Sequence, residues 1–287
     1  MQRSIMPMGK RSCVITLPSE WLQQQKLSSG DAVDVVSEGN VLLVSVHNQK
    51  KLRSFQEDIR KLDSMLNRYI GALYKAGYDD ITLSLDKKQV KTIESVLRRT
   101  LVGFEIIQVT KNSLHIQRIA ELDTIDVDTL IKQIFFTLQV IGDELVEALE
   151  QQDRTKITEI IHKDDQVNRL ADSARRYLNK RQGDCLSYAF VEQLENIGDS
   201  YKRVGQAGLE KKSISLKGLS SLNEILKHIY RLYYAFSLEE LETFGTAIEE
   251  VKKSTQEPKE LYLLYTQLFD IHGLALTKNI GGKKETI

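Results

Sequence analysis

Cysteine, proline and tryptophan are scarce in this chain, whose 287 residues include two cysteines, three prolines and one tryptophan. Cys13 and Cys185 lie far apart in sequence, so the chain lacks the cysteine pattern of a disulfide framework or a cysteine zinc site. Both are predicted to be free thiols. The scarcity of proline, together with long stretches of helix-forming residues, favours helices over β-sandwiches.

Long apolar runs and net charge are also missing. No run approaches the roughly 20 apolar residues that span a bilayer, and no signal-sequence pattern opens the chain. We therefore expect a cytoplasmic protein without membrane insertion. The 40 basic and 40 acidic residues balance to zero. The protein as a whole therefore does not attract nucleic acid, and any DNA binding must come from a local basic patch.

Catalytic motifs are absent as well. The sequence contains no Gly-x-Ser-x-Gly elbow, no Gly-rich phosphate loop and no Cys/His pairing typical of a nucleophilic enzyme. Glu159 and His162 form one Glu-x-x-His step of the kind that di-iron bundles use in pairs, but no second copy exists. We therefore expect no catalytic residues and no enzymatic function. His162 is expected to pack between helices or to lie at the surface.

Three segments differ in their residue patterns, and a chain of this length has room for two or three compact units. Residues 1–48 alternate like short strands, residues 49–121 mix helical and alternating patterns, and residues 122–287 are helical throughout. The predicted fold class is therefore α+β and multidomain, with an N-terminal β unit, a small α+β linker module and a C-terminal all-α domain.

The N-terminal segment combines short strands with a basic hairpin. An alternating run at residues 13–17 predicts a strand, a proline follows where a short helix can begin, and two further strands flank a Gly-Asn turn. Before Glu20 the chain carries Arg3, Lys10 and Arg11 but no acid. Basic side chains on a β-ribbon can hold phosphates and enter a groove of DNA. The alternative is a small solvated turn with a chance group of charges.

The basic hairpin is followed by the runs LPSEWL, LSSGDAVDVV and VLLVSV. This order resembles the AbrB-type (SpoVT/AbrB-like) swapped-hairpin DNA-binding domain, in which two copies interleave their strands into one barrel. The resemblance implies a homodimer with a swapped-hairpin β-barrel that binds DNA through Arg3, Lys10 and Arg11, with Ser12 nearby. Domains of this type also serve purely to dimerise, which leaves DNA binding open.

The middle segment is less diagnostic. Apolar residues at three- and four-residue spacing predict a helix that begins near Lys51, and an alternating run predicts a strand at residues 81–85. A second helix at residues 89–101 and two strands at residues 104–110 and 113–118 complete an α+β module. The second helix is basic in character, which suits either a DNA or partner surface or an ordinary solvated face.

The C-terminal segment predicts six helices in two groups of three. The expected helices span residues 124–150, 154–181, 185–209, 219–237, 239–254 and 259–280. A linker at residues 213–219 separates the two groups. The sequence therefore predicts an all-α bundle that is built from two three-helix groups.

Two of these helices carry paired polar positions. The runs HKDDQVNRLADSARRYL and LENIGDSYKRV contain Asp164 with Asn168 and Glu195 with Asp199, each pair four residues apart. These runs resemble the PhoU family of phosphate uptake regulators, whose helices carry two acids at this spacing and bind metal clusters. The resemblance implies a metal site at these four residues for a divalent or iron-type ion, although Asn168 stands where the family has a carboxylate. Oxygen ligands of this kind suit hard or borderline ions.

Helix periodicity indicates where these four residues lie. Glu195 and Asp199 fall opposite the apolar stripe of their helix and are expected to face outward, whereas Asp164 and Asn168 fall at the edge of a stripe. Two antiparallel neighbouring helices could bring all four together at a surface groove. The alternative is an ordinary charged helix face.

An AbrB-type unit joined to PhoU-type helices resembles the archaeal PhoU-family phosphate uptake regulators. The resemblance implies a dimeric transcriptional regulator that binds DNA at phosphate transport genes and whose helical domain senses a metal or partner signal. The alternative is a PhoU-like adaptor that acts through protein contacts with a phosphate transporter ATPase or a signalling kinase, without binding DNA. Salt dependence separates the two, because a DNA reader loses affinity steeply as salt rises.

Overall fold

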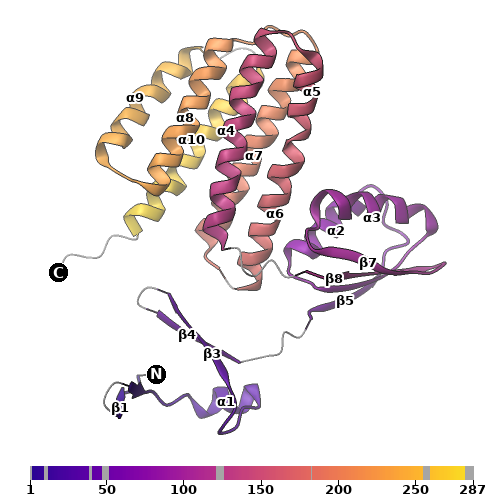
Figure 1. The fold of residues 1–287 in the computed structure, drawn as a ribbon, viewed down its shortest axis with the longest axis vertical. Coiled ribbons are helices and arrows are strands. Elements are labelled where there is room, and N and C mark those ends of the chain that lie inside the picture. Colours follow the sequence, from indigo (N-terminus) through magenta and orange to yellow (C-terminus); the bar gives the residue numbers. More distant parts are fainter. Residues whose placement is uncertain are drawn as a thin grey trace. The chain divides into compact units, whose positions relative to one another are not determined.

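The computed structural model of the chain describes residues 2–9, 12–38, 41–46, 52–120, 126–181, 183–254 and 259–281. The protein has a mixed α+β structure that divides into two compact units, Met1–Leu52 and Arg53–Ile287. Small sheets occupy the first part of the sequence, and the described chain beyond them is helical (Figure 1).

The N-terminal unit consists of two β-hairpins with a short helix between them in sequence. Its elements are β1 (Met6–Met8), β2 (Ser12–Val14), α1 (Ser19–Gln25), β3 (Val33–Glu38) and β4 (Val41–Val46). β1 pairs antiparallel with β2, and β3 pairs antiparallel with β4. Pro18 is the N-cap residue of α1 and Lys26 is its C-cap residue, whose left-handed backbone (φ 56°) turns the chain so that the N–H of Leu27 bonds to the carbonyl of Leu22 at 2.9 Å.

The described part of this unit has no hydrophobic core of its own. None of its described side chains between residues 2 and 46 is buried. Large apolar side chains are instead exposed: Ile5, Met6, Met8, Val14, Ile15, Val35 and Leu42. The two hairpins form separate two-stranded sheets, so no barrel closes within the described residues of one chain. Isolated two-stranded hairpins are only marginally stable in water, and this unit therefore needs further apolar contacts.

A small α+β module begins the second unit. Its elements are β5 (Ser54–Asp58), α2 (Leu66–Lys75), β6 (Asp80–Ser84), α3 (Lys87–Thr100), β7 (Phe104–Val109) and β8 (Ser113–Arg118). The sheet order is β5-β6-β8-β7, in which β5 runs parallel to β6 and the other neighbours are antiparallel. Figure 1 shows α2 and α3 covering one face of this sheet. Fully buried Ile70, Ile81, Leu83, Ile93 and Ile116 form part of the core between them.

The helix that the sequence predicts from Lys51 is wrong in its first part. Ser54–Asp58 is strand β5, and α2 begins only at Leu66. Apolar residues four positions apart, such as Phe55 and Ile59, satisfy a helical period but also fit a short strand that ends in a turn. The parallel pairing of β5 with β6 supplies the backbone hydrogen bonds that an isolated segment would obtain from a helix.

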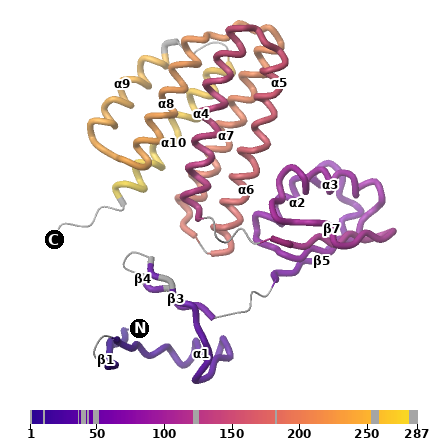
Figure 2. Tube along the Cα trace, viewed as in Figure 1, coloured from indigo at the N-terminus to yellow at the C-terminus, as the bar shows by residue number. Residues whose placement is uncertain are grey.

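The C-terminal region is a bundle of helices that share one hydrophobic core. Its helices are α4 (Val127–Glu150), α5 (Arg154–His162), α6 (Asp164–Lys180), α7 (Cys185–Leu209), α8 (Leu216–Tyr234), α9 (Leu238–Ser254) and α10 (Lys259–Gly281). They lie alongside one another in Figure 2. Fully buried Phe135, Phe190, Ile229 and Leu268 come from four of these helices and belong to the same core.

Side-chain caps explain where several of these helices begin. The carboxylates of Asp126, Asp153 and Asp184 accept the N–H of the residue three positions further on, at 2.7 to 2.9 Å. Ser215 Oγ accepts the N–H of Gly218 at 3.0 Å in the same way. Each cap satisfies one backbone N–H group that a helix start leaves without a partner. Asp123 and Thr124, which could cap the helix predicted from residue 124, lie outside the described residues.

The bundle differs from the prediction in two respects. The helix expected over residues 154–181 is divided at Lys163 into α5 and α6, where the N–H of Lys163 bonds to the carbonyl of Ile160, three residues back. Such a bond tightens the last turn of a helix. The two predicted groups of three helices are also not separate, because α10 packs on α7 and α8 packs on α4. Burial of apolar area across the groups joins them into one core.

Helix α6 connects the bundle to the α+β module. Both helices of the module, α2 and α3, pack against α6. Tyr74 near the end of α2 is fully buried, and its hydroxyl lies 3.2 Å from the hydroxyl of Ser173 on α6. The module and the bundle therefore meet along α6.

Candidate functional site

The residues predicted to bind DNA belong to the first hairpin of the N-terminal unit. Arg3 is exposed and lies three residues before β1. Ser12 is exposed at the start of β2, and its hydroxyl donates a hydrogen bond to the carbonyl of Met8. Lys10 and Arg11 lie outside the described residues. The described part of the hairpin thus presents Arg3 and Ser12 to solvent, where both are accessible to a phosphate group.

The residues predicted to bind a metal lie on the neighbouring helices α6 and α7. Asp164 is the first residue of α6 and is buried, with 2% of its surface exposed. Its Oδ2 accepts hydrogen bonds from Asn168 Nδ2 at 3.2 Å and from Lys202 Nζ at 2.8 Å. Burial raises the pKa of Asp164, and the negative charge of Asp199 adds to the increase, whereas Lys202 and Asn168 oppose it. The structure therefore brings Asp164, Asn168 and Asp199 close together.

Glu195 makes a different contact. Its carboxylate forms an ion pair with the guanidinium of Arg175 on α6, whose side chain is 3% exposed. Arg175 also lies within 3.3 Å of Glu192 and 3.4 Å of Asp172. The side chain of Glu195 is only 26% exposed, so the outward orientation that the helical period predicts is corrected to a half-buried one. The reason is that Arg175 lies on the buried face of α6 and draws Glu195 toward it.

Two features of these residues bear on metal binding in opposite ways. Asp164 Oδ1 and Asn168 Oδ1 are buried without a hydrogen-bond partner, and such oxygens are ligands that a hard cation prefers. However, the cations of Lys202 and Arg175 already contact carboxylate oxygens of Asp164 and Glu195. Among the described residues, no group of three His, Cys, Asp or Glu side chains is placed to hold a metal ion. As placed, the four residues do not fit an oxygen-ligated metal, and the metal site stays a prediction.

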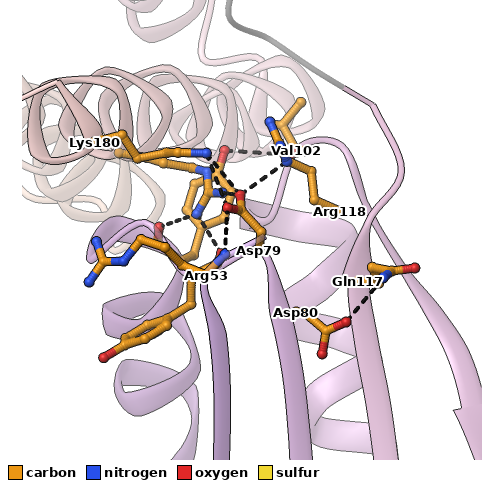
Figure 3. Close-up of polar contacts among 10 residues, drawn as sticks. Arg53, Asp79, Asp80, Val102, Gln117, Arg118 and Lys180 are labelled. Carbon is orange, nitrogen blue, oxygen red and sulfur yellow. Dashed lines mark hydrogen bonds and ion pairs between the residues drawn. The ribbon is translucent and has the colours of Figure 1, made fainter. Parts of the chain in front are cut away.

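A buried ionic junction that the sequence did not predict joins the α+β module to α6. Asp79, directly before β6, is 1% exposed. Its Oδ1 accepts from Arg118 Nε at 3.0 Å, from Lys180 Nζ at 2.9 Å and from the guanidinium of Arg176. Its Oδ2 accepts the backbone N–H of Arg53 at 3.2 Å. Figure 3 shows the side chains of Lys180 and Arg118 converging on Asp79. We call Asp79 and its three cationic partners the Asp79 junction.

The electrostatics of this junction follow from its cations. Burial by itself would raise the pKa of Asp79, but hydrogen bonds from Lys180 and from the Arg53 N–H, with the charges of Lys180 and Arg176, outweigh it. The pKa of Asp79 is therefore lowered. A buried carboxylate is tolerated only when it is paired and hydrogen-bonded, and Asp79 meets both conditions.

Arg176 connects α6 to the α+β module through several contacts. Its guanidinium lies 4.9 Å from the ring centres of both Tyr74 and Phe104, and it donates to the carbonyl oxygens of Tyr74 at 2.8 Å and Tyr78 at 2.7 Å. A planar guanidinium with five donors suits this combination of stacking and hydrogen bonding. Asn179 adds a bond from Nδ2 to the carbonyl of Lys75 at 2.8 Å. These contacts fasten α6 to the C-terminal end of α2.

One sequence signal could have drawn attention to Arg175, the partner of Glu195. Arg175 falls four residues after Ala171 and eight after Val167, so it lies on the apolar face of its helix. A charged residue on such a face requires a buried partner. The pattern cannot say which of the chain's many carboxylates provides it.

The comparisons with known proteins give no match: no protein-family model matches the sequence, and neither curated proteins nor solved structures show a significant similarity to the chain. Within the part of the chain that the structure describes, no helix combines the length and apolarity that crossing a membrane requires.

Proposed function

We propose that this chain is a homodimeric, DNA-binding regulator of phosphate uptake whose N-terminal unit is completed by a second copy. The observation that carries the proposal is that the described part of the N-terminal unit buries no side chain and exposes apolar strand residues such as Val14, Ile15, Val35 and Leu42. A partner surface that covers these residues stabilises the unit, by about 1.5 to 3 kcal/mol for each large aliphatic side chain that becomes fully buried.

A second copy of the same unit is the partner that fits best. It offers the same exposed strands, and a two-fold arrangement lets each hairpin cover the apolar residues of the other. Such interleaved units are stable only as dimers, so their folding depends on protein concentration. The AbrB-type resemblance of the sequence predicts this arrangement, which would create the swapped-hairpin barrel.

DNA binding follows from the charge of the first hairpin. Two copies would present Arg3, Lys10 and Arg11 twice, related by two-fold symmetry, as a DNA site with two half-sites requires. The PhoU-type resemblance of α6 and α7 supports phosphate transport genes as the target. The helical region would act as the receiver of a signal, provided that the signal favours one state of the dimer over the other.

An adaptor function has one observation in its favour. The bundle exposes several large apolar side chains, among them Phe136 and Val140 on α4 and Tyr262 and Phe269 on α10. Phe136 and Val140 are one helical turn apart and thus share a face. Exposed aromatic residues are common at protein interfaces. A transporter ATPase or a signalling kinase is the partner that the PhoU resemblance suggests.

The decisive experiment is fluorescence anisotropy with labelled DNA from upstream of the cell's phosphate-transport genes. Wild-type protein and the variant Lys10→Ala/Arg11→Ala are titrated at low and at physiological salt. A DNA regulator binds tightly with a steep salt dependence that the double substitution removes. The variant Arg203→Ala/Lys217→Ala, which removes two exposed charges from α7 and α8, serves as the control and should bind like the wild type. Equal, weak binding by all three proteins would exclude DNA binding and leave the adaptor.

Dimerisation is tested separately by light scattering after size-exclusion chromatography. Val35→Asp places a charge on β3, where it should prevent association of the N-terminal units and yield a monomer. Leu238→Asp, at an exposed leucine that begins α9, is the matched control and should remain dimeric. A Val35→Asp protein that is still dimeric would show that the N-terminal unit is not the dimer interface.

A further inference from the structure

A cavity of about 310 Å³ lies beside the Asp79 junction, where the α+β module meets the bundle. Its walls come from α2, from the loop before β7, from the end of β8 and from helices α4 and α6. Ligand cavities in proteins commonly begin at about 300 Å³ and lie between packed subdomains. The size and position of this cavity are therefore those of a small-molecule site.

The charge of the cavity wall has one sign. Four basic side chains contribute to it, Arg118, Arg169, Arg176 and Lys180, and none of the described lining residues is acidic. Asp79 contacts three of these cations but is not part of the wall. A wall of this composition attracts anions.

The pKa of Lys180 reflects its burial and the charges around it. Burial lowers its pKa, the contact with Asp79 opposes that effect, and the charges of Arg118 and Arg176 lower the pKa further. The net pKa shift is downward, so the contact with Asp79 does not fully offset the combined effect of burial and the two neighbouring guanidinium groups. An additional anion in the cavity would favour the charged form of Lys180.

The rest of the wall is apolar or aromatic. Val102, Leu130 and Leu170 line it together with Tyr74 and Tyr177. Apolar and aromatic walls with a few polar groups are typical of sites for organic ligands. An inorganic anion would leave this apolar wall in contact with water, whereas an apolar group attached to the anion would cover it.

We propose that this cavity binds a small organic anion, in which a phosphate or carboxylate group is attached to an apolar body of about the size of an aromatic ring system. The anionic group lies against Arg169, and the body lies against the leucine and tyrosine side chains. Arg169 is exposed on α6 and is thus well placed to receive the ligand at the mouth of the cavity. This site is additional to the proposed DNA-binding function and does not depend on it.

The test is a titration of the full-length protein with 1-naphthyl phosphate, followed by the fluorescence anisotropy of the naphthyl group. We expect saturable binding by the wild type. 1-Naphthol, which keeps the body without the charge, and inorganic phosphate, which keeps the charge without the body, should each bind at least about tenfold more weakly. Loss of one charge-assisted contact is a change of this size. No saturable binding of 1-naphthyl phosphate up to millimolar concentration would overturn the proposal.

Two variants locate the site. Arg169→Ala removes an exposed cation of the wall and should weaken binding about tenfold. Arg203→Ala removes another exposed arginine, on α7 outside the wall, and should have no effect. Gln166→Trp, at another exposed lining residue, should block the cavity and abolish binding. Equal affinity of the wild type and both cavity variants would place the ligand elsewhere and overturn the assignment. If inorganic phosphate bound as tightly as the naphthyl ester, the proposal that the ligand carries an apolar body would be overturned.

Discussion

Two regions of the second unit each bury an aspartate, Asp79 against α6 and Asp164 within α6, and the pKa values of the two carboxylates shift in opposite directions. Asp79 and Asp164 are 1% and 2% exposed, yet the pKa of Asp79 is lowered and the pKa of Asp164 is raised. Asp79 is contacted by three cations and a backbone N–H. Among the described residues, Asp164 pairs with one cation, Lys202, and has a nearby acid, Asp199. Burial alone thus does not determine the state of a carboxylate, because the number of partners decides whether its charge is compensated.

The two sites also differ in how far their cationic side chains are exposed to solvent. The Asp79 junction connects two parts of the fold through side chains that are mostly buried, with Arg176 8% and Arg118 7% exposed. The Asp164 contact uses the ammonium of Lys202, whose side chain is 35% exposed. Lys202 can therefore move into water at little cost, whereas Arg176 cannot.

The largest expected effect is that of Arg176→Met. The substitution keeps an unbranched side chain of similar length but leaves the carboxylate of Asp79 and the carbonyls of Tyr74 and Tyr78 with fewer donors. Removing one partner of a buried ion pair costs about 3 to 5 kcal/mol, and we expect the free energy of unfolding to fall by this amount in urea denaturation. Arg203→Met, at an exposed position on α7, should change it by less than about 0.5 kcal/mol. Similar values for the two variants would show that the junction does not stabilise the fold.

The next largest expected effect is the difference in free energy of unfolding between the variants Asp79→Asn and Asp164→Asn. Asp79→Asn leaves the cations of the junction without a carboxylate and should lower the free energy of unfolding by about 3 kcal/mol. Asp164→Asn should lower it by at most about 1 kcal/mol, because the neutral amide resembles the protonated form that the raised pKa favours and Lys202 can turn to solvent. Both values come from chemical denaturation at pH 7. An Asp164→Asn protein that is less stable than Asp79→Asn would reverse the comparison.

The pH dependence of stability should also have opposite signs at the two sites. The folded-state pKa of Asp79 lies below the unfolded value of about 3.9, so its contribution is present above that pH and is lost as pH falls through the folded pKa. The folded-state pKa of Asp164 lies above the unfolded value, so the native state binds more protons between the two and stability rises as pH falls through that window.

Urea denaturation at pH 7, 5, 4 and 3.5 measures these differences. Relative to Asp164→Asn, the wild type should gain stability as the pH falls from 7 toward 4. Relative to Asp79→Asn, its advantage should stay constant above about pH 4 and shrink below it, given the unfolded pKa of Asp. Parallel curves for the two variants would mean that the carboxylates have similar pKa values.

The smallest expected effect concerns metal binding between α6 and α7. Lys202→Ala removes the cation that occupies Asp164 Oδ2 and leaves buried oxygens of Asp164 and Asn168 for a metal. We expect this variant to take up more Mn²⁺ than the wild type after equilibrium dialysis and elemental analysis. Arg203→Ala is the control, because it removes a nearby exposed charge of α7 without touching Asp164. Equal, stoichiometric uptake by the wild type would show that Lys202 does not stand in the way of a metal.

Much of the secondary structure could be predicted because its signals are local. The helix expected at residues 185–209 has those bounds in the structure, where Asp184 caps it. The strand expected at residues 81–85 is shifted by one residue to Asp80–Ser84. By contrast, β5 was not predictable from its own residues, since Ser54–Asp58 is a strand only through its pairing with β6. Local periodicity describes an amphipathic segment well but cannot identify a strand that depends on a distant partner.

For the predicted sites, too, local contacts could be predicted from the sequence and contacts between helices could not. The spacing of Asp164 and Asn168 along one helix implied that they lie close together, and Asn168 Nδ2 does contact Asp164 Oδ2. The sequence did not indicate that Lys202 and Arg175 would pair with Asp164 and Glu195, because these contacts depend on how α6 and α7 pack. Nor did it indicate Asp79 as a buried site, since its partners Arg118 and Arg176 are far away along the chain.

By itself, the sequence determined the order of its elements: short strands, an α+β module and a long helical region, each set by periodicity and caps that act over a few residues. Only the tertiary structure decided which charges meet. Asp79 and Arg176 are 97 residues apart in the chain, and their pairing depends on the packing of the module against α6. The free energy of a buried charge depends on every partner that packing brings within a few ångströms, and that set of partners is a property of the folded chain.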